Sequence, residues 1–410
     1  MKSFLLTIFT LGSLLFYAQH ASCDGSRYYS AQYSVDSTLG VVFGNSTTQG
    51  GVNADLKFDF FEPAGDVAIN RPLIILAFGG SFISGTREDM HSYCAYYASK
   101  GFACATIDYS LYFGPLFPIP DSITMTDEVI KAVSDMKAAI RYFREDAATT
   151  NQFKIDSNLI FVGGISAGSI VGLHAGMLQE TNTVQPYIDS ILTENGGWTG
   201  NSSTNFQYGD QVAGIINYSG ALKWASYVDA NDPPVFSVHD DDDGTVPYAS
   251  GSASIFGFPI IDLEGSSLIH AKAQSEGVTS ELITIPNSSG HVSYFGTQAG
   301  ADSILLRSLE FVYPLICNQL APVGINEVTL LKEMELYPNP AMNQVQLELS
   351  TSEKLNLSIF DITGRVVLTE KTNGIATIID VSNLLPGNYF IEVKSLQGII
   401  EYERKQFVKL

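Results

Sequence analysis

A serine between two glycines is the first residue whose surroundings point to chemistry. It lies in Gly164-Ile-Ser166-Ala-Gly168, directly after the apolar, partly β-branched run from Leu159 to Val162. Apolar residues at helical spacing follow this turn, namely Ile170, Val171, Leu173 and Met177. A strand, a G-x-S-x-G turn and a helix in immediate succession form a nucleophile elbow, which lifts one hydroxyl clear of a sheet at a helix N-terminus. We therefore predict that Ser166 is a nucleophile.

A serine nucleophile needs backbone donors for the oxyanion that forms when it attacks a carbonyl. An early apolar run ends in Phe78-Gly79-Gly80, where two glycines let N–H groups turn toward a ligand without side-chain interference. We expect the N–H groups of Gly79 and Gly80 to act together with that of Ala167, the residue after the nucleophile. A simple Gly-Gly turn is the structural alternative.

An acidic turn offers the carboxylate that must orient a catalytic base. Four aspartates, Asp240 to Asp243, follow an apolar strand that starts at Val235, and each of them could in principle reach a histidine. A solvated turn and a calcium loop are the alternatives. The calcium pattern fails, because its glycine at the sixth position would place His239 rather than an acid at the first. Asp243, directly before the turn glycine, is our candidate.

One of the six histidines is suited to be the base. His291 alone follows the last predicted strand, in a polar loop that can present an imidazole. The others lie in the N-terminal leader, before the acid in sequence, within the elbow helix, in the acidic turn or in a helical segment: His20, His91, His174, His239 and His270. The order Ser166, Asp243, His291 is that of G-x-S-x-G hydrolases, and it favours a catalytic triad over a surface histidine.

Alternation of strand and helix patterns indicates how these residues are positioned. Short apolar runs are separated by amphipathic helical patterns from residue 73 to residue 312, which predicts an α/β fold with a doubly wound, mostly parallel sheet. Residues 27–64 alternate apolar and polar side chains, as antiparallel edge strands do. Residues Glu180 to Asp210 show little periodicity, so a roof over the site and an ordinary surface loop both stay open.

Composition limits the classes of function. The 410 residues include 43 acidic and 22 basic ones, for a net charge of -21, with 45% hydrophobic and 16% charged residues. Such a chain forms packed domains, two by its length, and its acidity argues against nucleic acid or anionic membranes as partners. No Cys or His cluster suggests a metal, and we expect no cofactor.

The N-terminal residues 1–22 have the basic start, apolar stretch and small-residue end of an export signal peptide. A retained anchor and a lipidated Cys23 fit less well, because the apolar run is short and His20 is unusual before a lipidation site. Export makes the four cysteines candidates for disulfides, with three possible pairings: Cys23, Cys94, Cys104 and Cys317. A Cys23–Cys317 bridge would tie the ends of the catalytic domain, but the sequence does not choose.

The C-terminal part has a different pattern. We expect a catalytic domain over residues 23–317, a linker over 318–333, where the apolar rhythm is lost, and a second domain over 334–410. Short alternating runs separated by turn residues such as Pro386-Gly387 predict that this second domain is a small all-β sandwich.

Residues 71–294 resemble the α/β-hydrolase fold, in its carboxylesterase and lipase branch with an H-G-G-G type of oxyanion motif. The resemblance is carried by the segment Gly164 to Gly168 and by His239 to Pro247, which is similar to the family's H-G-x-x-D-x-x-V-P segment and puts the triad acid on Asp243. Three positions depart from the family pattern. Phe78 replaces the first His of the oxyanion motif, Asp240 replaces the Gly after His239, and Ser110 stands where Arg is common.

Residues 336–410 resemble a C-terminal sorting domain of the type IX secretion system, which one phylum of Gram-negative bacteria uses. The matching residues are Tyr337-Pro-Asn-Pro340, Asp361-Ile-Thr-Gly364, Leu385-Pro-Gly-Asn-Tyr389 and Lys405 to Leu410. The resemblance implies a protein that is secreted or held at the cell surface, whose tail is read by the secretion machinery and then removed.

We therefore expect a secreted serine carboxylic ester hydrolase that works through an acyl-enzyme. Its substrate would be a small-molecule or polymer-linked ester, such as an acetyl, feruloyl or short acyl ester. Trp198, Tyr248 and Tyr294 either line a pocket or belong to the core, so the substrate-binding residues are unknown. A secreted serine peptidase of the same fold and a non-catalytic binding protein that retains the fold are the alternatives.

Overall fold

The computed structural model describes residues 26–47, 53–319, 334–349, 355–361, 365–394 and 405–410. They form two compact units, of which the larger is Arg27–Gln319. The expected signal peptide and nearly all of the expected linker lie outside the described residues. Among the helices that the structure describes, none combines the length and apolarity needed to cross a bilayer.

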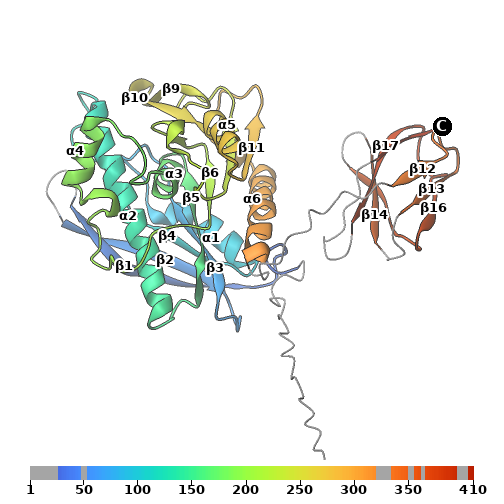
Figure 1. Cartoon of the computed structure of the whole chain (residues 1–410), viewed down its shortest axis with the longest axis horizontal. Coiled ribbons are helices and arrows are strands. Elements are labelled where there is room, and N and C mark those ends of the chain that lie inside the picture. The colour runs from blue at the N-terminus through green and yellow to red at the C-terminus, as the bar shows by residue number, and fades with distance from the viewer. Residues whose placement is uncertain (1–25, 48–52, 320–333, 350–354, 362–364, 395–404) are drawn as a thin grey trace, which may run out of the picture. The chain divides into compact units, whose positions relative to one another are not determined.

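The larger unit is built on an eight-stranded sheet with the order β1-β2-β4-β3-β5-β6-β8-β11 (Figure 1). Strands β1 and β2 pair antiparallel, and so do β2 and β4, whereas all the other neighbours are parallel. The predicted mostly parallel sheet with antiparallel strands at one edge is confirmed. The bounds are β1 Val35–Thr47, β2 Asn53–Pro63, β3 Arg71–Ala77, β4 Ala103–Ile107, β5 Ile155–Ile165, β6 Gly214–Tyr218, β8 Val235–Asp240 and β11 Ser280–Ile285.

Helices cover both faces of this sheet, as a doubly wound fold requires (Figure 1). On one face α1 and α6 lie together, because Tyr97 of α1 and Ser308 of α6 are hydrogen-bonded at 2.8 Å between their hydroxyl oxygens. On the other face α2 packs against α3. The helices are α1 His91–Ala98, α2 Ser122–Ala148, α3 Ala167–Met177, α4 Pro186–Glu194, α5 Ser266–Glu276 and α6 Gln298–Gln319, with short 3-10 turns η1 Arg87–Met90, η2 Gly197–Thr199, η3 Ala225–Tyr227 and η4 Ser293–Phe295.

Two elements of this unit were not predicted from sequence. Helix α4 lies within residues 180–210, where periodicity is weak. A second, three-stranded sheet joins β7 Ala221–Leu222, β9 Ser250–Ile255 and β10 Phe258–Gly265 in the order β7-β10-β9. Strand β9 alternates serine with glycine and alanine before it reaches Ile255, so it lacks the large apolar residues by which strands are recognised.

The C-terminal unit is the predicted all-β sandwich. One sheet has the order β12-β13-β16 and the other β15-β14-β17-β18, all antiparallel. Its own core of buried residues includes Leu347, Ile359, Ile391 and Phe407. The strands are β12 Glu335–Tyr337, β13 Gln344–Glu348, β14 Asn356–Asp361, β15 Val366–Lys371, β16 Ala376–Asp380, β17 Gly387–Lys394 and β18 Lys405–Lys409.

The cysteines divide into two kinds. Cys317 is disulfide-bonded, while Cys94 and Cys104 are free and buried. Burial raises the pKa of the Cys104 thiol, which disfavours its reactive thiolate. A bridge between Cys317 and Cys23, one of the pairings that the sequence left open, would involve a residue outside the described part of the chain.

Helix α2 buries a carboxyl group that has no protein partner. Glu128 is fully buried, and neither of its carboxyl oxygens accepts or donates a hydrogen bond within the described residues. Burial raises the pKa of Glu128 to about 7, although Lys131 partly opposes the shift. The folded protein therefore retains a proton at Glu128 over a pH range in which the unfolded chain has released it.

We predict that Glu128→Gln gains stability relative to the wild type as the pH rises. Between the unfolded pKa near 4.5 and the folded value of about 7, the wild type loses stability because the folded state binds more protons. The neutral glutamine escapes this loss, so the difference in free energy of unfolding should shift in favour of the variant by about 3 kcal/mol across that window. Urea denaturation from pH 4 to pH 8.5 measures it, with the exposed Glu194→Gln as control. A pH-independent difference would contradict the buried-proton account.

Candidate active site

Ser166 stands at a sharp turn between β5 and α3. Its φ of 55° and ψ of -117° lie outside the conformations that L-residues prefer, a strain typical of functional turns. The end of β3 packs against this turn so tightly that a Cβ at Gly164 or Gly168 would lie 2.3 or 2.0 Å from the carbonyl oxygen of Ala77. Only glycine fits at these two positions, which is the physical reason for the G-x-S-x-G pattern.

The structure brings Ser166, His291 and Asp243 into one hydrogen-bonded chain. The Nε2 atom of His291 lies 2.7 Å from the Oγ of Ser166, and its Nδ1 lies 2.6 Å from Oδ2 of Asp243. A carboxylate can only accept, so Nδ1 carries the proton and Nε2 is left to accept from the serine hydroxyl. This arrangement is what a general base needs in order to activate a hydroxyl.

Asp243 is held as an ionised carboxylate inside the protein. Its side chain is fully buried, and its Oδ1 accepts from the N–H groups of Thr245 and Val246 at 2.8 and 3.1 Å. Burial by itself would raise the pKa of Asp243, but contacts with His239 and His291 and these backbone donors lower it well below its usual range. Asp243 therefore keeps its charge beside the imidazole throughout the neutral pH range.

Two neighbouring aspartates hold the loop that carries His291. Asp240 is fully buried and accepts hydrogen bonds from the hydroxyls of Ser288 and Ser293 and, at 3.0 Å, from the Ser293 N–H. Asp241 accepts from the N–H groups of Asn287 and Ser288 at 2.9 and 3.0 Å. The loop is thus anchored on both sides of the histidine. Sequence reasoning noted Asp240 as one of four candidate acids and as a departure from the family pattern, but not as an anchor of this loop.

The loop after β3 lies beside the serine. A Cβ at Gly79 would lie 3.4 Å from the Cβ of Ser166, so the chain passes close to the nucleophile. The Gly80 carbonyl accepts from the N–H groups of Ile83 and Ser84, and a trans peptide points its N–H away from its C=O. The N–H of Ser81 is therefore directed away from that turn.

Backbone donors remain open at this place. Within the described residues, the N–H groups of Gly80, Ser81 and Ala167 donate to no protein acceptor. Ala167 owes this to its position at the first turn of α3, where backbone N–H groups lack helical partners. Sequence analysis did not name Ser81. Its place directly after Gly80 is the signal that could have identified it. Ser81 and Phe82 both have positive φ, 56° and 62°, which is strained for residues with side chains.

The remaining departures from the family pattern are absorbed by local packing. The ring of Phe78 stacks on Tyr109 with ring centres 4.3 Å apart, and the Tyr109 hydroxyl donates to the Phe78 carbonyl at 2.8 Å. Ser110 donates through both its N–H and its hydroxyl to the buried carboxylate of Asp135. Burial raises the pKa of Asp135 to about 6, although the hydrogen bonds from Ser202 and Ser110 oppose the shift.

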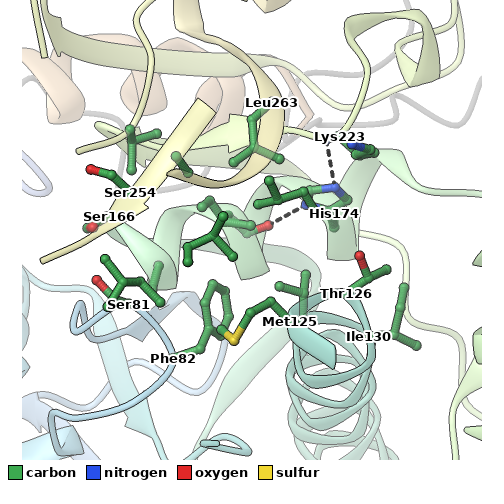
Figure 2. Close-up of a pocket in the computed structure, with 18 of the residues that line it drawn as sticks. Ser81, Phe82, Met125, Thr126, Ile130, Ser166, His174, Lys223, Ser254 and Leu263 are labelled. Atoms are coloured by element: carbon green, nitrogen blue, oxygen red, sulfur yellow. Dashed lines mark hydrogen bonds between the residues drawn. The ribbon is translucent and has the colours of Figure 1, made fainter. Parts of the chain in front are cut away.

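A deep apolar pocket of about 80 Å³ opens beside Ser166 (Figure 2). Helix α2 supplies Met125 and Ile130, α3 supplies Ile170, and the unpredicted β9–β10 hairpin covers the opposite side with Ala253 and Leu263. The rest of its apolar wall is formed by Phe82, Val129, Leu178, Ile188, Val246, Ile255, Ile260 and Ile261. The pocket lies between the sheet's helical layer and the hairpin, and it ends at the serine.

Other candidates from sequence have different places. Trp198, Tyr248 and Tyr294 do not line this pocket, and Tyr294 is buried with its hydroxyl 3.0 Å from that of Ser219. From the segment 180–210 the pocket receives Ile188 of α4, so this segment contributes to the wall, whereas the β9–β10 hairpin forms the larger cover.

Within the described residues, the histidines that we set aside do not contact Ser166, although His239 Nε2 lies 3.4 Å from Oδ2 of Asp243. His91 lies 2.8 Å from Asp59, His239 contacts Ser266 and Val246, and His270 lies 2.8 Å from the hydroxyl of Ser280. His174 lines the pocket, at the end away from Ser166. His20 is outside the described residues. In the described ranges no group of three or more His, Cys, Asp and Glu is arranged to hold a metal ion.

Comparison with protein families divides the chain as the two units do. Residues 58–221 match the BD-FAE family, an α/β-hydrolase esterase family, and residues 335–409 match the secretion system C-terminal sorting domain. The first match includes Ser166 and the loop after β3. Comparison with curated proteins gave no match.

Solved structures of a thermophilic esterase from the Planctomycetes species Thermogutta terrifontis are similar to the chain. The propionate-bound form of its esterase 2 is 20% identical, with a TM-score of 0.49, over 71% of this chain and 97% of that one. The form phosphorylated by paraoxon is 20% identical, with a TM-score of 0.49, over 70% and 96%.

We predict that Asp240→Asn lowers kcat about 10- to 100-fold while KM changes little, because the histidine loop loses a charged anchor and the imidazole loses its exact placement. Steady-state kinetics on a nitrophenyl ester separates the two constants. Asp242→Asn is the matched control, since this exposed aspartate in the same turn does not hold the loop through its side chain. An unchanged kcat in Asp240→Asn would contradict a positioning role.

Proposed function

We propose that this chain, an esterase-like α/β-hydrolase joined to a secretion sorting domain, is an exported serine carboxylic ester hydrolase. The observation that carries the proposal is the 2.7 Å contact between Ser166 Oγ and His291 Nε2, continued at 2.6 Å to Asp243. A hydroxyl so placed, on a strained turn at the end of a strand, is poised to attack a carbonyl carbon.

In the first half-reaction Ser166 Oγ attacks the ester carbonyl carbon, and His291 Nε2 takes the hydroxyl proton. The ring becomes positively charged, which the ionised Asp243 stabilises. Negative charge that develops on the carbonyl oxygen is held by backbone N–H groups of the loop at Gly79, Gly80 and Ser81 and by that of Ala167. His291 then returns the proton to the alcohol as the C–O bond breaks, leaving an acyl-enzyme.

Water completes the reaction. His291 takes a proton from a water molecule, whose oxygen attacks the acyl carbon, and the same oxyanion donors hold the second tetrahedral intermediate. The proton is returned to Ser166 Oγ as the acid leaves. The imidazole is accessible to such a water, because 23% of its side chain is exposed.

Acetyl, feruloyl and short acyl esters all contain the bond that this mechanism breaks. The match to an esterase family over residues 58–221 supports esters above amides. A peptidase would use the same catalytic groups, and a panel of fluorogenic dipeptides assayed beside the esters tests that alternative. Neither Phe78 nor Asp240 favours a non-catalytic binding protein, since the packing of both side chains leaves the contact between Ser166 and His291 intact.

In this proposal the C-terminal unit is the part that directs export of the hydrolase. A sorting domain over residues 335–409 is the part that the type IX secretion machinery would read, placing the hydrolase at the cell surface or outside the cell. Polymer-linked or environmental esters would then be its accessible substrates.

We predict that Ser166→Ala lowers kcat for a nitrophenyl ester by at least about 10³-fold without unfolding the protein. The variant should also fail to react with an organophosphate probe that labels the wild type. Ser190→Ala, an exposed hydroxyl deletion on α4, serves as control and should keep full activity. Near-normal hydrolysis by Ser166→Ala would overturn the proposed nucleophile.

We predict that removal of residues 334–410 keeps the hydrolase inside cells that possess type IX secretion. The larger unit has its own core, so esterase activity should persist in the cell lysate while activity in the medium and at the cell surface is lost. Assays of whole cells, medium and lysate measure the distribution. Unchanged activity outside the cell would contradict the sorting role.

A further inference from the structure

The pocket beside the serine follows helix α3. Ser166 lies at one end and His174 at the other, with Ile170 one helical turn from the serine (Figure 2). Residues eight positions apart on an α-helix are separated by roughly 12 Å. The pocket is thus elongated, and its volume of about 80 Å³ has room for several water molecules.

Several polar groups on the pocket wall already have hydrogen-bond partners within the protein. The hydroxyl of Thr126 donates to the Ser122 carbonyl at 2.7 Å, and that of Ser254 donates to the Gly244 carbonyl at 2.8 Å. The ammonium group of Lys223 donates to the backbone carbonyl of Asp262 at 2.8 Å. The hydroxyl protons of Thr126 and Ser254 are therefore already used, whereas the Lys223 ammonium group has two further N–H donors.

His174 closes the far end as a neutral ring. Its Nδ1 donates to the Ile170 carbonyl at 2.8 Å, and its Nε2 accepts from the backbone N–H of Lys223 at 3.0 Å, so both ring nitrogens are used (Figure 2). Burial lowers the pKa of His174 to about 4, which keeps the ring uncharged near neutral pH. Tyr227 also lines the pocket, and its buried hydroxyl has no hydrogen-bond partner within the described residues.

The position of the base decides which half of an ester enters this pocket. His291 must protonate the leaving alcohol, so the alcohol lies on the side of the imidazole. His291 does not line the pocket, whereas Ser81 and Ala167, two of the proposed oxyanion donors, do. The acyl half, on the other side of the carbonyl carbon, therefore points along α3 toward His174.

We propose that this pocket is an acyl site for a straight aliphatic chain of medium length, on the order of six to ten carbons for a cavity roughly 12 Å long. The inference rests on the proposed ester hydrolysis and narrows its substrate class. An acetyl group would leave most of the apolar wall uncovered. A feruloyl group would bring a phenolic hydroxyl and a methoxy group to an apolar wall where both ring nitrogens of His174 are already used.

A chain-length series of nitrophenyl esters from acetate to dodecanoate, with methyl ferulate beside it, tests this site. The value of kcat/KM should rise about fourfold per added methylene from acetate until the pocket is filled between hexanoate and decanoate, and then level off or fall. Methyl ferulate should be hydrolysed at least tenfold less efficiently than a methyl ester of the preferred aliphatic acid. A preference for acetate or for ferulate would overturn the proposal.

Substitutions in the β9–β10 hairpin test whether the acyl chain of the substrate lies in this pocket. Ala253→Phe fills the pocket from β9 and should lower the ratio of octanoate to acetate kcat/KM at least tenfold. Ser250→Phe, which adds the same ring at an exposed position of the same strand, should leave the ratio unchanged. If Ala253→Phe does not fold, Ile261→Ala, which deletes wall carbons on the paired residue of β10, should lower the ratio severalfold.

The outcomes separate the acyl site from the proposed function. An unchanged octanoate-to-acetate ratio in a folded Ala253→Phe protein that still hydrolyses esters would overturn the acyl site alone. Failure of the wild type to hydrolyse any ester in the series would overturn ester hydrolysis, and the acyl site with it.

Discussion

The active-site arrangement depends on the alignment of parallel strands at one edge of the sheet. β5, β6, β8 and β11 are neighbours in that order, so their carboxyl ends share an edge. The loops that follow β5, β8 and β11 carry Ser166, Asp243 and His291. Residues separated by 125 positions can therefore come within 2.7 Å of each other. The sheet fixes the points where these loops begin, and short hydrogen bonds between the three side chains complete their placement.

The aspartates of the acidic turn after β8 have two different roles: one contacts the imidazole of His291, and two hold the loop around it. Asp243 faces the imidazole of His291 and keeps its charge through contacts that outweigh the cost of burial. Asp240 and Asp241 instead anchor the backbone and hydroxyls on the loop around that histidine. One turn thus sets both which ring nitrogen carries the proton and where the ring lies, so the neighbouring aspartates each have a separate partner.

The apolar pocket shows how burial of polar residues can produce an apolar surface. His174, Thr126 and Ser254 are polar residues, yet the side chain of each donates its hydrogen bond to a backbone carbonyl. The pocket therefore presents hydrocarbon along α3 while the catalytic groups remain at its end. This division suits an ester whose acyl part is apolar and whose alcohol part faces water.

The sequence by itself determined the sheet, the elbow and the order Ser166, Asp243, His291, because strand periodicity, turn glycines and chain order are local or sequential signals. Only the tertiary structure decided the pocket, since β9 consists mostly of serine, glycine and alanine, and the apolar residues of the β9–β10 hairpin meet those of α2 and α3 only in the folded chain. The same holds for Asp240 and His174: a residue type states which hydrogen bonds are possible, and three-dimensional neighbours decide which are made.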